Sequence, residues 1–136
     1  MRKLHEIAND LRDLLKDDFR TVRISSVQTS EQMLQELKSI NPDKMPATII
    51  LLEDWRMVEE NTLRDVSVCI VLADSFRSGS DERALSVLER SEKLFEIFPP
   101  DGRIVNGAFY LPFDCQAASV DRQFACLALR LNIRER

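Results

Sequence analysis

The chain has 136 residues, a length typical of one domain, so we expect a single domain over residues 1–136. Hydrophobic residues make up 44% and charged residues 31%, which is close to the globular average and argues against intrinsic disorder. The 19 Lys and Arg residues against 23 Asp and Glu residues give a net charge of −4, and because nucleic-acid-binding domains usually carry a basic excess, we expect no specific nucleic-acid partner.

The first third of the chain predicts two helices with a strand between them. Apolar residues recur at helical spacing from Leu4 to Leu15, which predicts an amphipathic helix that ends near Asp17. The β-branched residues that follow predict a strand over Arg20–Val27. Thr29 stands three residues before Gln32, the spacing of a capping box, and begins a short helix that ends at Asn41–Pro42.

The middle of the chain predicts two neighbouring strands. A continuous apolar run over Ala47–Glu53 indicates a buried strand. A longer strand is expected over Thr62–Phe76, where both faces carry small or apolar residues and both should be covered. The connection Asp54–Asn61 is too short for a crossover helix, so the two strands should form an antiparallel hairpin.

A third helix is predicted after this hairpin. Ser80 is a suitable N-cap, and acidic residues follow it in the first turn. Pro99–Pro100 ends the helix, and its apolar stripe consists of Ala84, Leu85, Leu88, Leu94, Phe95 and Phe98.

The C-terminal part of the chain predicts a short hairpin and a long strand. Arg103–Val105 and Ala108–Leu111 flank Asn106–Gly107, a pair that tolerates the positive φ values of a type I′ turn. Residues 112–120 are expected to form a loop, and Asp121–Arg134 shows the clearest two-residue period in the chain. The residues of that strand expected to point into the core are Ala125, Leu127, Leu129, Leu131 and Ile133.

This order of elements predicts an α+β fold. We expect a mostly antiparallel sheet of about four to five strands, with the helices packed on one face.

The cysteines and the apolar runs indicate a cytosol-like compartment. The longest apolar run, Ala47–Leu52, is far shorter than the roughly 20 residues of a membrane span, and the first residues lack the apolar core of a signal peptide. Cys69, Cys115 and Cys126 are odd in number and stand in apolar or extended contexts, so we expect reduced thiols. We expect no membrane partner.

The residue types that carry catalysis are sparse. The chain has one histidine, His5, and no two cysteines within four residues of each other, so we expect no metal and no cofactor. A thiol nucleophile at Cys115 would need His5 to be brought close by folding, and the Ser78–Ser80 loop before a helix could hold an anion. The carboxylate pair Glu53–Asp54 is interpreted as a solvated strand end. We therefore predict no catalytic residue and no enzyme activity.

Five residues are candidates for a protein interface, because aromatic residues, Met and Arg are enriched there. Trp55 and Met57 fall in the expected hairpin loop, while Phe124 and Arg130 lie on the second face of the last strand. Arg77 follows the long strand, where it is either a solvated charge or a bridge to an acid of a neighbouring subunit. Two interpretations of Trp55 stay open, an interface residue or a residue folded onto the core.

The layout of the chain also resembles that of a known family. A buried strand at Ala47–Leu52 is followed by a long strand ending at Val71–Asp74, a polar loop at Ser75–Ser80, a helix at Ala84–Leu88 and an alternating last strand. This order, over Leu4–Ile133, is similar to that of the small tail-terminator and tail-completion proteins of long-tailed bacteriophages, including Mu-like prophages.

The resemblance implies a non-enzymatic structural protein. Such a protein forms a ring of identical copies, a hexamer being favoured, that caps the tail tube and joins it to the head connector. Its partners would be further copies of itself, the tail tube and head-connector proteins. It would occupy the bacterial cytoplasm during assembly and the virion tail afterwards.

Two other functions stay open from the residues alone. The first is a small non-catalytic adaptor or immunity-like binding module that uses Trp55, Met57 and the acids around them. The second is a small enzyme that uses Cys115 or the Ser78–Ser80 loop.

Overall fold

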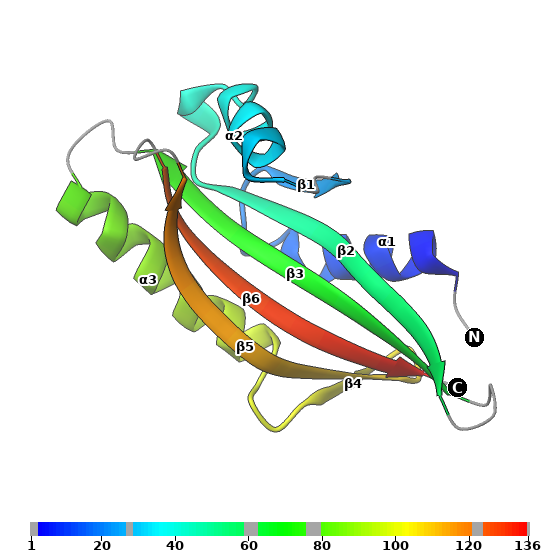
Figure 1. Ribbon diagram of the computed structural model, residues 1–136. Helices are drawn as coiled ribbons and strands as arrows, with labels where there is room; N and C mark the ends of the chain where they lie inside the picture. Colours follow the sequence, from blue (N-terminus) through cyan, green and yellow to red (C-terminus); the bar gives the residue numbers. More distant parts are fainter. Residues whose placement is uncertain (1–2, 27–28, 59–62, 76–79, 121–123, 136) are drawn as a thin grey trace.

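The computed structural model describes residues 3–26, 29–58, 63–75, 80–120 and 124–135 (Figure 1). The helices are α1 (Leu4–Leu15), α2 (Ser30–Lys38) and α3 (Ser80–Ile97), with a short 3₁₀ helix, η1, at Pro42–Lys44. The strands are β1 (Val22–Ser25), β2 (Ala47–Val58), β3 (Leu63–Ser75), β4 (Arg103–Val105), β5 (Ala108–Val120) and β6 (Phe124–Glu135).

The described strands form one six-stranded sheet in the order β1-β2-β3-β6-β5-β4. β1 runs parallel to β2, and every other neighbouring pair is antiparallel. The α+β class, the mostly antiparallel sheet and the β2–β3 hairpin are confirmed. The strand number is larger than the four to five expected, because the short strands β1 and β4 both join the sheet as its edges (Figure 1).

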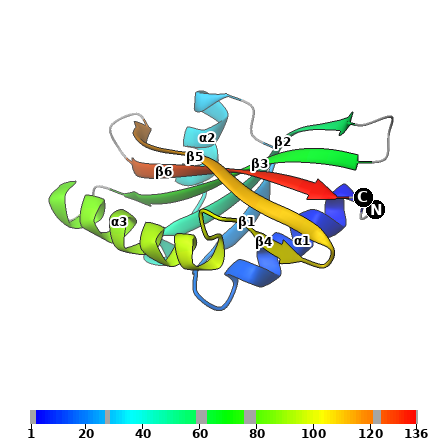
Figure 2. The same cartoon turned by 90° about the horizontal axis from the view of Figure 1, so that it is seen from below.

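One face of the sheet packs against α1 and α3, and this side holds the larger core (Figure 2). The alternating residues of β6 point into it as predicted, with Leu129 opposite Ile70 of β3 and both fully buried. Phe98, just after α3, stacks parallel to Tyr110 of β5 with ring centroids 6.1 Å apart. This stack joins the end of α3 to the sheet.

The prediction that the helices pack on one face is wrong, because α2 packs on the opposite face (Figure 2). Met33 and Leu37 of α2 contact a second cluster that includes Ile49 of β2 and Val71 of β3. A parallel pair of strands needs a crossover connection, and α2 supplies the one between β1 and β2. The small apolar residues on this face are covered, as expected. The helix that covers them is α2, which forms the crossover connection.

Two segments expected to be loops continue as strands. β2 runs on to Val58 and β5 to Val120, so much of the expected loops Asp54–Asn61 and 112–120 pairs with neighbouring strands. Each strand passes through a shift in register, between Leu52 and Asp54 in β2 and between Pro112 and Asp114 in β5. A bulge takes up the extra residue and lets the pairing resume, which sequence alternation alone does not reveal.

The local cap and turn signals are confirmed. The backbone N–H of Gln32 donates to the Thr29 hydroxyl at 3.2 Å, and the Thr29 N–H donates to the Gln32 side chain at 3.2 Å. Between β4 and β5, Asn106 and Gly107 have φ values of 49° and 80°, the left-handed region that the tight turn requires.

Candidate functional site

α2 covers only one end of its face of the sheet and leaves the other end without a helix (Figure 2). We call this uncovered end the open face, and its polar residues are Glu53, Asp54, Arg56, Asp65, Ser67, Asp114, Arg130, Asn132 and Arg134. They come from β2, β3, β5 and β6, so the open face crosses the centre of the sheet.

The open face arises because the side chains on this face of β3 and β6 change from apolar to polar along each strand. The alternation of side chains between the two faces continues through the change. On β3, the side chains of this face run from Val71 and Cys69 under α2 to Ser67 and Asp65 beyond it. On β6, they change from apolar residues to Arg130, Asn132 and Arg134 along the same direction. Because successive side chains of a strand alternate between faces, these polar groups cannot reach the core.

Arg130 ties three strands together at the centre of the open face. Its Nη1 donates to Oδ2 of Asp114 on β5 at 3.1 Å, and its Nε donates to Oε1 of Glu53 on β2 at 3.3 Å. β3 lies between β6 and β2, so the Arg130 side chain reaches over it above Cys69. The charge of Glu53 and the hydrogen bond to Asp114 raise the pKa of Arg130 above its usual value.

A second pair lies nearer the C-terminal end of β6. Arg134 donates from Nε and Nη2 to the two carboxylate oxygens of Asp65, at 2.7 and 2.8 Å. Asp65 is buried, and the hydrogen bonds from Arg134 hold its pKa below the ordinary 3.8 despite the opposing effect of desolvation. A carboxylate held in this way stays ionised at neutral pH and is a poor proton donor.

A hollow of about 240 Å³ lies beside this pair, lined by Asp54, Arg56, Asp65, Ser67 and Asn132. Its walls are polar side chains of the open face. Two carboxylates and one arginine line it, and the carboxylate of Asp65 is already held by Arg134.

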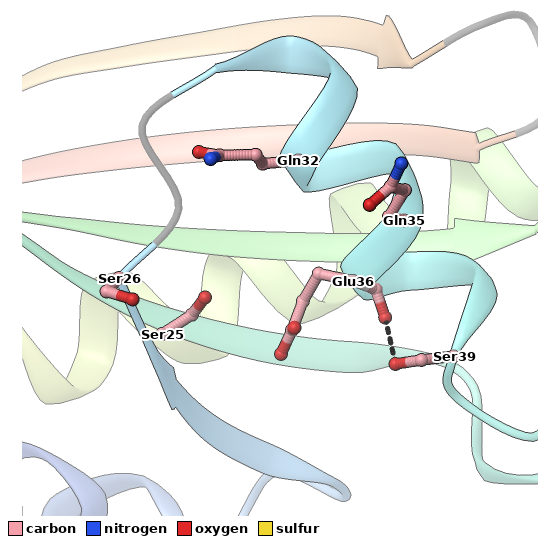
Figure 3. Close-up of a pocket in the computed structure, with 6 residues that line it drawn as sticks. All are labelled: Ser25, Ser26, Gln32, Gln35, Glu36 and Ser39. Carbon is pink, nitrogen blue, oxygen red and sulfur yellow. Dashed lines mark hydrogen bonds between the residues drawn. The ribbon is translucent and has the colours of Figure 1, made fainter.

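A second hollow, of about 290 Å³, lies between the end of β1 and α2 (Figure 3). Its walls are hydroxyl, amide and carboxylate groups of Ser25, Ser26, Gln32, Gln35, Glu36 and Ser39. Ser39 Oγ donates to the backbone carbonyl of Glu36 at 2.6 Å and accepts from Arg23 at 3.2 Å. Arg23 also lies 3.7 Å from the Glu36 carboxylate, so the charged groups at this hollow bind one another.

The surroundings of Cys115, the candidate thiol, disfavour its thiolate form. Cys115 is exposed on β5, and partial burial followed by the charge of Asp114 raises its pKa above the ordinary value. A raised pKa leaves less thiolate at neutral pH. His5 is exposed on α1. Of the candidate anion-binding loop, Ser78 and Gly79 lie outside the described residues, and Ser80 begins α3.

The candidate interface residues lie in different parts of the structure and do not form one surface. Arg130 is on the open face, and Met57 is half-buried near the end of β2. Phe124 is buried in the cluster beneath α2, so the structure assigns it to the core instead of an exposed surface. The backbone of Trp55 pairs with that of Val66 on β3. The side chain of Trp55 and all of Arg77 lie outside the part of the chain that the structure describes.

Some of the exposed residues are large and apolar. Leu85 and Leu88 of α3 were assigned to the apolar stripe of that helix, but they are 60% and 54% exposed. Ile104, Phe109 and Phe113 on β4 and β5 are also exposed. The strand pattern could have marked Phe109, because Tyr110 beside it occupies the core face.

No known protein family matches the chain, and a search of curated proteins finds no relative. Among the described residues, no three His, Cys, Asp or Glu side chains are grouped as a metal site requires. The helices in the described part of the chain are too short or too polar to cross a membrane.

Proposed function

We propose that this protein is a structural component of a phage tail, which caps the tail tube as a ring of identical copies and joins it to the head connector. The observation that supports this function best is the open face. It is broad, lies on the sheet, and carries acids of β2, β3 and β5 that are held by two arginines of β6. Such a surface suits contact with another protein.

The charges of the open face favour a protein partner over a nucleic acid. Glu53, Asp65 and Asp114 alternate with Arg130 and Arg134 and neutralise them. A polyanion is bound by an excess of Lys and Arg, whereas a mixed pattern of charge selects a partner with the matching pattern. We therefore assign the open face to the tail tube or the head connector.

The proposed function is tested by the mass of the protein in solution, alone and with tail tubes. Light scattering after size exclusion, over a concentration series, is expected to show one discrete oligomer, either at high concentration or only when tubes are present. Electron micrographs should then show the protein at tube ends. A chain that remains at 15.7 kDa throughout and leaves tube ends bare would contradict the proposal.

A charge-reversing variant tests the role of the open face. Arg130→Glu places a third acid beside Glu53 and Asp114 and should weaken binding to tube ends by tenfold or more, about the effect of a single interfacial charge. Lys38→Glu on α2 is the matched control, because Lys38 is exposed on α2 and outside the open face. A stable complex of one copy with one other protein, without any ring, would instead favour the adaptor function.

A further inference from the structure

We draw no further inference here: the strongest candidate, the exposed apolar patch of Ile104, Phe109 and Phe113 on β4 and β5, carries none, because nothing in the structure shows what covers it.

Discussion

Asp65 of β3 and Arg134 of β6 face each other directly across the centre of the sheet, and the arginine holds both oxygens of the carboxylate. The acid is buried while the arginine is half-exposed. This arrangement keeps a charged group at the centre of a sheet stable, because two charge-assisted hydrogen bonds replace the water that the carboxylate loses.

The Asp65–Arg134 pair should make stability depend on pH on the acid side. The folded pKa of Asp65 lies below 3.8, so its contribution is fully present above the unfolded pKa and is lost as the pH falls through the folded pKa. Asp65→Asn should lower the free energy of unfolding at pH 7 by about 1–2 kcal/mol and reduce the loss between pH 5 and pH 2.5. Urea denaturation across this range measures both effects.

The control for this prediction is Asp13→Asn on α1. Asp13 is exposed and pairs with Lys16 at 3.5 Å, so its replacement should change stability little at any of these pH values. If Asp65→Asn shows the same acid-side loss as the unchanged chain, Asp65 is not responsible for the pH dependence.

The Arg130–Asp114 pair should contribute only modestly to stability. Both side chains are about one-third exposed, so solvent screens their attraction. A double-mutant cycle with Arg130→Ala and Asp114→Ala should give a coupling energy of about 0.3–1 kcal/mol, which decreases in 0.5 M salt. A coupling above about 2 kcal/mol that salt leaves unchanged would mean that the pair is effectively buried.

Leu129 and Leu85 form a matched pair for testing the inward face of β6. Leu129 is 1% exposed, so Leu129→Asp places a charge in the larger core and should unfold the protein, at a cost of about 4 kcal/mol or more. Leu85→Asp, at a site that is 60% exposed, should change the free energy of unfolding by about 0.5 kcal/mol or less. Circular dichroism and urea denaturation of both variants check this, and a folded Leu129→Asp would be decisive evidence against the packing.

The three cysteines should differ in reactivity. Burial raises the pKa of Cys69 to about 11 and that of Cys126 to about 12, whereas Cys115 is exposed. Iodoacetamide should therefore add once to the folded protein, at Cys115, and three times in urea. The rate at Cys115 should still be rising above pH 9, because its pKa is also raised. Mass spectrometry counts the adducts and locates them, and rapid labelling of Cys69 in the folded state would show that α2 opens.

Several features of the fold could be predicted because they depend on neighbouring residues. The two-residue period of β6 identified Leu129 and its neighbours as inward, and the spacing of Thr29 and Gln32 identified the start of α2. The site was harder to predict. Arg130 was a candidate, but its partner Glu53 stands 77 residues away in the chain, and no local pattern indicates such a pair.

The sequence by itself determined the class of the fold, the order of most elements, the β2–β3 hairpin and the turn at Asn106–Gly107. Each of these follows from hydrophobic period, backbone preference or a short connection. Only the tertiary structure decided that α2 covers the opposite face, that Phe124 is buried beneath it, and that Leu85 stays exposed. The physical reason is that a period states which side chains share a face, whereas the element that covers that face is set by contacts between distant segments.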